Sequence, residues 1–157
     1  MPNVATELET SAVQEIIEGL TQSLSETVVT THKAQNFHWN VTGMTFGSLH
    51  ELFQQIYEDH FAAQDDLAER IKALDGHALG SLKAHLDRAK TEESDGHLDD
   101  KSMISALQGD QEAIAGTLNA LAEVAGRHGD TLTEDLAIER GRVHEKFAWM
   151  LRAHLKG

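Results

Sequence analysis

The chain has 157 residues, with 13 Lys and Arg against 26 Asp and Glu, so its formal net charge is −13. Such an acidic chain is a poor non-specific binder of DNA, because neutralising phosphates requires clustered Lys and Arg. It has no Cys, which excludes disulfides, thiolate zinc sites and cysteine nucleophiles. Its ten His, beside many carboxylates, leave a metal site of imidazole and carboxylate ligands open.

The length suits one domain with a sizeable core. We place this domain over residues 11–157, behind a flexible acidic N-terminal tail of residues 1–10. No stretch approaches the roughly 18–20 apolar residues that a membrane span needs. The start of the chain lacks the basic and apolar regions of a secretory signal. We therefore expect a cytoplasmic protein with no membrane partner.

Four long segments have apolar residues at intervals of three and four, the spacing of one face of an α-helix. In chain order they cover about residues 11–41, 48–74, 100–125 and 131–155. Capping boxes, in which a Ser or Thr pairs with a Glu or Gln three residues later, are expected at three helix starts. They are Ser11 with Gln14, Ser48 with Glu51, and Thr131 with Glu134.

A long joint separates the second and third helical segments, and residues 81–90 within it have the pattern of a short helix. Connections between neighbouring helices in bundles are usually short. A long joint instead indicates a crossover between two helices that run in the same direction. We therefore predict an all-α four-helix bundle with a short helix in the long crossover between helices two and three.

The second segment carries four potential metal ligands on one narrow arc, namely His50, Gln54, Asp65 and Glu69. Asp65 and Glu69 are one helical turn apart and can reach the same cation, although alone they also fit a solvated helix face. His50 and Asp65, however, are about 22 Å apart along a straight helix. A shared site would therefore require two antiparallel helices that meet at a two-fold axis.

His38 closes the first segment on its packed side, where it can meet His50 across the turn at residues 42–45. A histidine on an apolar helix face is more often a hydrogen-bonded core residue than a ligand. That interpretation is favoured for His60, whereas His38 and His50 stay open between the two roles. No zinc-protease helix, phosphate-binding loop or nucleophile elbow occurs in the chain.

An ordered set of motifs resembles the Dps family, the dodecameric miniferritins. The motifs are Asn36-Phe37-His38-Trp39-Asn40-Val41-Thr42-Gly43, then Phe46, Leu49-His50-Glu51, Asp65-x-x-Ala68-Glu69-Arg70 and the closing segment 143–152. The match covers about residues 11–156, and its order and spacing make it specific. It implies a ferritin-like four-helix bundle, assembled as a homododecamer whose ferroxidase centres are shared across two-fold interfaces.

The resemblance also implies which residues form each centre. The metal ligands would be His38 and His50 of one subunit with Asp65 and Glu69 of the partner subunit. Trp39 would be an electron-transfer residue, and its alternative role is packing at an interface. The family usually has an Asp where this chain has Gln54, and an amide is a neutral, weaker ligand. The centre would therefore hold two irons or one, and zinc can take the place of iron.

The activity implied is oxidation of Fe(II) to Fe(III), with hydrogen peroxide preferred over dioxygen. Ferric mineral would then be stored in a hollow shell, which protects against oxidative stress. Acidic pores and an acidic inner wall would attract cations. Candidate pore residues are Asp110 and Asp135, and candidate wall residues are Glu58, Asp59 and Asp66.

Two other functions remain as alternatives. A metal-sequestering shell with slow turnover is suggested by Gln54. A DNA-compacting nucleoid protein is a second alternative, but residues 1–12 contain Glu7 and Glu9 and no Lys or Arg. We therefore expect no direct DNA binding, or weak binding only.

Overall fold

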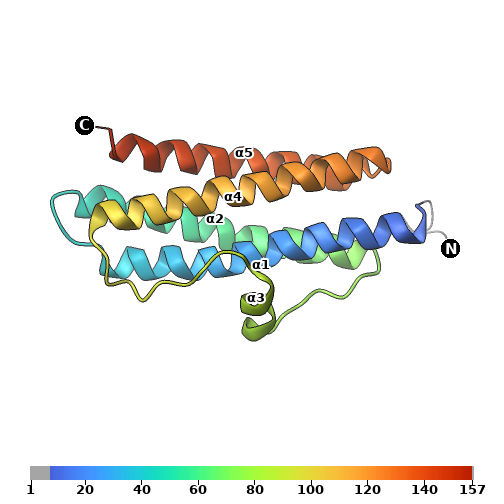
Figure 1. The fold of residues 1–157 in the computed structure, drawn as a ribbon, viewed down its shortest axis with the longest axis horizontal. Coiled ribbons are helices and arrows are strands. Elements are labelled where there is room, and N and C mark those ends of the chain that lie inside the picture. The colour runs from blue at the N-terminus through green and yellow to red at the C-terminus, as the bar shows by residue number, and fades with distance from the viewer. Residues whose placement is uncertain (1–7, 157) are drawn as a thin grey trace.

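The computed structural model describes residues 8–156, which form five α-helices and no strand (Figure 1). The long helices are α1 (Thr10–Asn40), α2 (Phe46–Ala73), α4 (Asp100–Arg127) and α5 (Thr131–His154), and the short helix is α3 (Leu82–Arg88). This confirms the predicted all-α bundle and its short crossover helix. The expected N-terminal tail lies mostly outside the described residues, and Thr10 already belongs to α1. Within residues 8–156, no helix combines the length and apolar character needed to cross a membrane.

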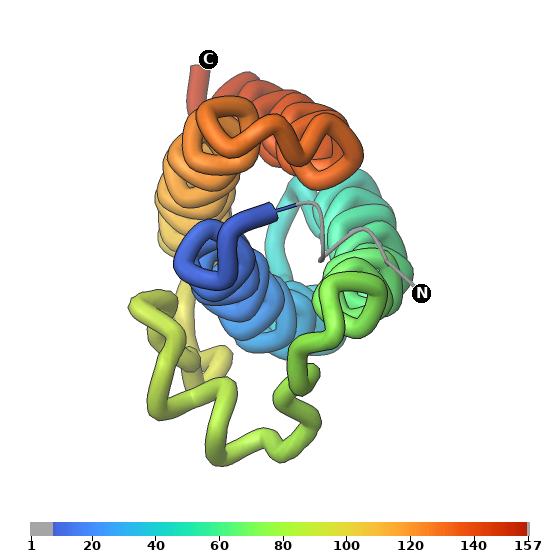
Figure 2. The backbone as a smooth tube through the Cα atoms, turned by 90° about the vertical axis from the view of Figure 1, so that its right-hand side faces the viewer, coloured from blue at the N-terminus to red at the C-terminus, as the bar shows by residue number. Residues whose placement is uncertain are grey.

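The four long helices surround a common axis, and the crossover passes outside them (Figure 2). α1 packs against α2, and α4 packs against α5, while α1 also contacts α4. α2 and α4 run in the same direction in Figure 1, as the long joint between them predicted. α3 stands off the bundle and contacts α1.

The capping boxes predicted for the first two helices are wrong. α1 begins before Ser11, and its N-cap residue Glu9 makes no side-chain capping bond. α2 begins at Phe46, so Ser48 lies within its first turn. The Ser48 hydroxyl donates to the backbone carbonyl of Thr45 at 3.1 Å instead of capping the helix.

The N-cap of α5 is Asp130, not the predicted Thr131. The Asp130 carboxylate accepts from the backbone amide of Thr133 at 3.1 Å. It also accepts from Arg70 of α2 at 2.8 Å, and Arg70 donates to the Thr133 hydroxyl at 2.8 Å. Because Asp130 satisfies a helix end and an arginine of another helix together, this tertiary contact sets the boundary.

A buried carboxylate holds the crossover against α1. Glu26 accepts from the backbone amides of Lys90 and Thr91, both at 2.9 Å, and from the Thr91 hydroxyl. Gln22 donates to the same carboxylate at 2.8 Å. Burial opposes ionisation of Glu26, but these hydrogen bonds outweigh burial and lower its pKa. The segment after α3 is thereby fixed along the outside of the bundle.

The core has two apolar clusters, one toward each end of the bundle. One includes Ile16, Leu20, Leu67, Ile71, Ile114 and Leu118. The other includes Phe37, Leu49, Phe53, Ile56, Leu107 and Leu151. Burial of each side chain of this kind stabilises a fold by about 1.5–3 kcal/mol.

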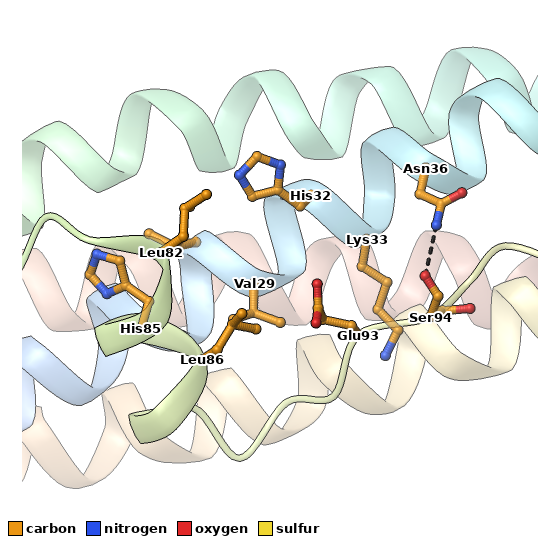
Figure 3. A pocket seen from close by; sticks show the side chains of 10 residues that line it. Val29, His32, Lys33, Asn36, Leu82, His85, Leu86, Glu93 and Ser94 are labelled. Atoms are coloured by element: carbon orange, nitrogen blue, oxygen red, sulfur yellow. Dashed lines mark hydrogen bonds between the residues drawn. The ribbon is translucent and has the colours of Figure 1, made fainter.

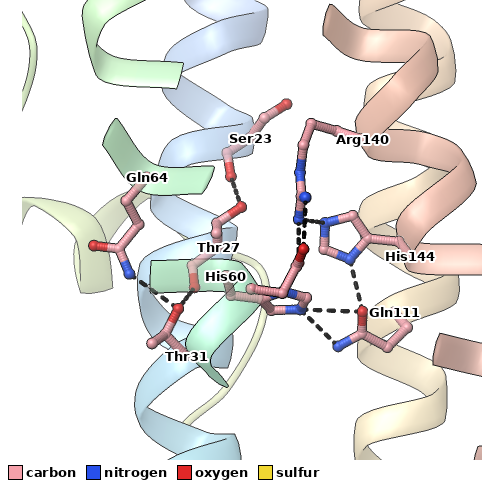
Figure 4. A network of polar contacts seen from close by, with 9 residues as sticks. Ser23, Thr27, Thr31, His60, Gln64, Gln111, Arg140 and His144 are labelled. Carbon is pink, nitrogen blue, oxygen red and sulfur yellow. Dashed lines mark hydrogen bonds and ion pairs between the residues drawn. The ribbon is translucent and has the colours of Figure 1, made fainter. Parts of the chain in front are cut away.

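Between the two clusters, polar side chains form a closed ring of contacts (Figure 4). Asp59 accepts from Arg140 at 2.8 and 3.2 Å and from His60 Nδ1 at 2.9 Å. Gln111 lies between the two imidazoles, with its amide nitrogen 3.0 Å from His60 Nε2 and its oxygen 2.7 Å from His144 Nδ1. Arg140 Nη2 lies 3.5 Å from His144 Nε2 and closes the ring. His60 is therefore a core residue, as predicted.

The contacts of the ring and its burial together favour the neutral form of both imidazoles. Because the Asp59 carboxylate can only accept, His60 Nδ1 carries a proton, and His60 Nε2 accepts from the Gln111 amide. The Gln111 oxygen then accepts from His144 Nδ1, and His144 Nε2 faces the Arg140 guanidinium as an acceptor. Both imidazoles are neutral. Burial is the main cause that lowers the pKa of each, and the pKa of His144 lies well below the ordinary value.

α1 completes this polar layer with hydroxyl groups. Thr27 donates to the backbone carbonyl of Ser23 at 2.7 Å, and Thr31 donates to that of Thr27 at 2.6 Å. Gln64 of α2 donates to the Thr31 hydroxyl at 2.9 Å (Figure 4). These bonds satisfy polar groups that would be costly to bury without partners.

The neutral imidazoles predict a stability that falls in mild acid. A group whose pKa is lower in the folded chain binds fewer protons there, so stability is lost as the pH falls below the unfolded value of about 6.5. The loss is at most about 1.4 kcal/mol per pH unit for each imidazole. Thermal unfolding followed between pH 8 and pH 5 should therefore show a falling midpoint.

The His144→Gln variant should show a shallower fall, because Gln cannot be protonated in this range. His97→Gln, which changes an exposed histidine of the crossover, is the matched control and should keep the slope of the unmodified chain. Equal slopes in all three proteins would contradict the assignment of the ring.

Candidate metal centre

The turn between α1 and α2 brings two predicted ligands together. Its residues are 41–45, and Gly43 has a φ of 105°, a conformation that favours glycine. The imidazoles of His38 and His50 stack across it with ring centroids 3.7 Å apart and an interplanar angle of 14°. Both residues come from helix ends next to the turn, so the pair depends on the packing of α1 against α2.

Reciprocal hydrogen bonds orient both rings. His38 Nδ1 donates to the backbone carbonyl of His50 at 2.6 Å, and His50 Nδ1 donates to that of His38 at 2.7 Å. Because a carbonyl only accepts, each Nδ1 carries the proton and each Nε2 keeps a lone pair. Within residues 8–156, neither Nε2 has a hydrogen-bond partner. Histidines that bind metals usually have this arrangement, in which a hydrogen bond from one ring nitrogen orients the other toward the ion.

Two aromatic rings flank the pair. Phe46 stacks on His50 with centroids 5.0 Å apart, and Tyr57 meets His38 edge to face at 5.3 Å. Sequence reasoning did not assign them this role, although Phe46 is one turn before His50 and Tyr57 is two turns after it. Trp39 follows His38 in the chain and is 66% exposed in the single subunit.

Gln54 lies one turn after His50 on α2 and is half-buried. Its amide nitrogen donates to the exposed carboxylate of Glu58 at 2.8 Å. Gln54 is therefore close in sequence to the histidine pair, and the nitrogen of its amide is already bound to Glu58.

The two predicted carboxylate ligands lie elsewhere on the same helix. Asp65 and Glu69 are exposed, and neither has a hydrogen bond or ion pair to another of the described residues. α2 is unbroken, so Asp65 lies about 22 Å from His50 along the helix axis. Asp65 lines an open groove of about 450 Å³ between α1, α2 and the segment that leads into α3.

One chain therefore holds the predicted ligands in two separate groups. No group of three or more His, Asp or Glu side chains able to hold a metal ion occurs among residues 8–156. The structure brings His38 and His50 together and leaves Asp65 with Glu69 at the other end of α2.

The predicted pore and wall residues have different surroundings. Asp110, expected at a pore, forms a mostly buried ion pair with Lys33 of α1 at 2.9 Å, and burial raises its pKa. Asp59, expected on the inner wall, belongs to the core ring, where the hydrogen bonds from His60 and Arg140 outweigh burial and lower its pKa far below the ordinary value. The carboxylates of Asp110 and Asp59 are thus bound within the chain. The remaining candidates, Glu58, Asp66 and Asp135, are exposed.

A separate cavity of about 250 Å³ lies between α1 and the crossover (Figure 3). Val29, Leu82 and Leu86 line it together with His32 and His85. The buried His85 ring lies with Nδ1 2.9 Å from the Ser25 hydroxyl, and burial lowers its pKa. None of the predicted metal ligands lines this cavity, so the histidine pair remains the candidate centre.

Comparisons with known proteins first give the class. A model of the ferritin-like domain matches residues 17–157 of the chain. The chain is 33% identical to a Dps protein from Bacillus brevis, whose crystal structure superposes with a TM-score of 0.91 over 95% of this chain and 100% of that one. Dps from Vibrio cholerae O1 superposes with a TM-score of 0.90 at 32% identity, covering 95% of this chain and 94% of that one. The fold is therefore that of a ferritin-like four-helix bundle.

Curated relatives then define the family. The DNA protection during starvation protein of Brevibacillus brevis is 35% identical over 151 residues, which cover 95% of this chain and all of the relative. General stress protein 20U of Bacillus subtilis (strain 168) is 32% identical over 142 residues, covering 90% and 98% of the two chains. The chain belongs to the Dps family.

The Phe46 ring stacked on His50 should keep the His50 imidazole in the orientation that binds a metal. Replacing Phe46 with Ala should lower the affinity for Zn(II) by about tenfold or more, because residues that orient ligands usually contribute that much. Competition with a chromogenic chelator measures the affinity. Leu132→Ala, at an exposed site on α5, is the control and should bind as the unmodified protein does. Equal affinities for both variants would show that the stacking has no such role.

Proposed function

We propose that the chain is the subunit of an iron-oxidising and iron-storing miniferritin. The orientation of the histidine pair is the observation that carries this proposal. His38 and His50 each have Nδ1 bound to a backbone carbonyl and Nε2 free, as metal-binding imidazoles require. The family supports the choice of metal, since its member from Vibrio cholerae O1 is described as one of the ferritin-like diiron-carboxylate proteins.

A two-fold contact between subunits would complete the centre. Two antiparallel copies of α2 would bring His50 of each subunit beside Asp65 and Glu69 of the partner subunit, and the symmetry would make two equal centres. Exposed apolar side chains beside the acidic half-site support such a contact, because Phe61 and Leu82 are 71% and 61% exposed in the single subunit. The assembly that we propose is a homododecamer with a hollow interior.

The chemistry follows from the ligands. Imidazole and carboxylate groups bind iron, and anionic oxygens stabilise Fe(III) over Fe(II). Two Fe(II) ions would each lose one electron, and one hydrogen peroxide would take both electrons with two protons and become two waters. Holding two ions at one centre thus avoids release of a hydroxyl radical. Dioxygen is the less favoured oxidant, and zinc can occupy the same ligands without redox chemistry.

Other residues have supporting roles in this proposal. Trp39, next to His38, is the candidate for electron transfer at the centre. Asp135 and the exposed wall carboxylates would guide cations toward the interior, helped by the charge of −13 on every subunit. The stored ferric mineral would protect a cytoplasmic compartment against oxidative stress. Direct DNA binding is not part of the proposal, because the same negative charge repels phosphate.

Peroxide-driven oxidation gives the first test. Purified protein is loaded with Fe(II) without oxygen, hydrogen peroxide is added, and ferric absorbance is followed in the near ultraviolet. Oxidation should be faster than in buffer, and His50→Ala and Asp65→Ala should each slow the fast phase about tenfold or more, since each removes a ligand. A rate equal to that in buffer would overturn the proposal.

Mixed assemblies test whether the centre is shared. A subunit with His50→Ala keeps its carboxylates, and a subunit with Asp65→Ala keeps its histidines. Co-expressed in equal amounts, the two variants should recover about a quarter of the fast oxidation, because about half of the two-fold pairs are mixed and each has one intact centre. If each centre lay within one subunit, mixing would restore nothing beyond the two variants alone.

A metal-sequestering shell with slow turnover is the second candidate function, and Gln54 favours it. A neutral amide binds a second ion more weakly than a carboxylate and stabilises Fe(III) less. Tight Fe(II) or Zn(II) binding with slow oxidation would distinguish this function from rapid ferroxidase activity.

A further inference from the structure

We infer that Glu58 is a positioning residue that orients the Gln54 amide, so that the amide oxygen is the end offered to iron. This inference rests on the proposed function, because it concerns the same centre. It assigns Glu58 a specific role beyond that of an acidic wall residue.

The two ends of an amide differ in what they can bind. The oxygen is a metal ligand with lone pairs, whereas the nitrogen is a hydrogen-bond donor that a cation repels. A carboxylate at this position would present an oxygen in either rotation. Gln54 presents an oxygen only when its amide is held in one of two orientations.

The contact with Glu58 selects one orientation. The Gln54 amide nitrogen lies 2.8 Å from a carboxylate oxygen of Glu58, one turn further along α2. In the reversed amide two oxygens would face each other, so the carboxylate excludes that orientation. Binding the nitrogen to Glu58 leaves the amide oxygen of Gln54 without a hydrogen-bond partner among residues 8–156, so the oxygen is the end that can bind an ion.

Two further observations support this role. Glu58 has no ion pair with any Lys or Arg among residues 8–156, so no cation competes with the Gln54 amide for its carboxylate. The ring of the neighbouring Tyr57 packs edge to face against the His38 ring, with centroids 5.3 Å apart. One turn of α2 therefore contacts both the histidine pair and the Gln54 amide.

A double-mutant cycle tests the inference. The assembled protein, Glu58→Ala, Gln54→Asp and the variant with both changes are titrated with Fe(II) in the absence of oxygen, and calorimetry gives the number of ions and their affinities. Glu58→Ala should weaken the second ion about tenfold and leave the first unchanged. In the Gln54→Asp background, Glu58→Ala should leave the affinity for the second ion unchanged, because a carboxylate presents an oxygen in either rotation.

Glu51→Ala is the matched control, since it removes an equal charge from an exposed site on the same helix and should leave both ions unaffected. Equal weakening in the two backgrounds, or by Glu51→Ala, would show a general charge effect and overturn the inference. Lack of any second-ion effect of Glu58→Ala would overturn it too. Failure of the proposed function is distinct, because then His50→Ala would bind Fe(II) as well as the unmodified protein does.

Discussion

The unbroken length of α2 is the constraint on which the rest of the molecule depends. The helix runs from Phe46 to Ala73 and carries His50 near one end and Asp65 toward the other. A rigid helix holds these groups about 22 Å apart. Side-chain flexibility cannot close such a gap, so one chain cannot bring His50 and Asp65 to the same ion. In the function that we propose, a second subunit would supply the carboxylates to each histidine pair.

The polar ring in the core keeps α2 in its place. A core filled with apolar side chains can tolerate small slides between helices, whereas a slide here would leave buried groups of His60, Gln111 or Arg140 without partners. Each such loss costs about 1–3 kcal/mol. The ring therefore fixes both the rotation of α2 about its own axis and its position along the bundle relative to α4 and α5. The direction in which α2 presents His50, Asp65 and Glu69 is therefore set by contacts of other residues of the same helix.

Periodicity was sufficient to predict the helices, because the apolar spacing on each one matches the face that it buries. The same spacing placed His60 in the core and put His38 near His50. Features decided by tertiary contacts were not predictable in this way. Asp130 caps α5 because Arg70 of another helix reaches it, and Glu26 reaches backbone amides 64 and 65 residues away. The ring members come from three helices and have no common motif.

Gln54 shows how local contacts can change what a substitution means. Read alone, an amide in a metal centre signifies a lost charge and a weaker ligand. The structure places the Glu58 carboxylate one turn away, where it accepts from the amide nitrogen and leaves the amide oxygen oriented for a ligand. In the proposed centre a second Fe(II) would meet an oriented but neutral oxygen, which binds the ion less tightly than a carboxylate would.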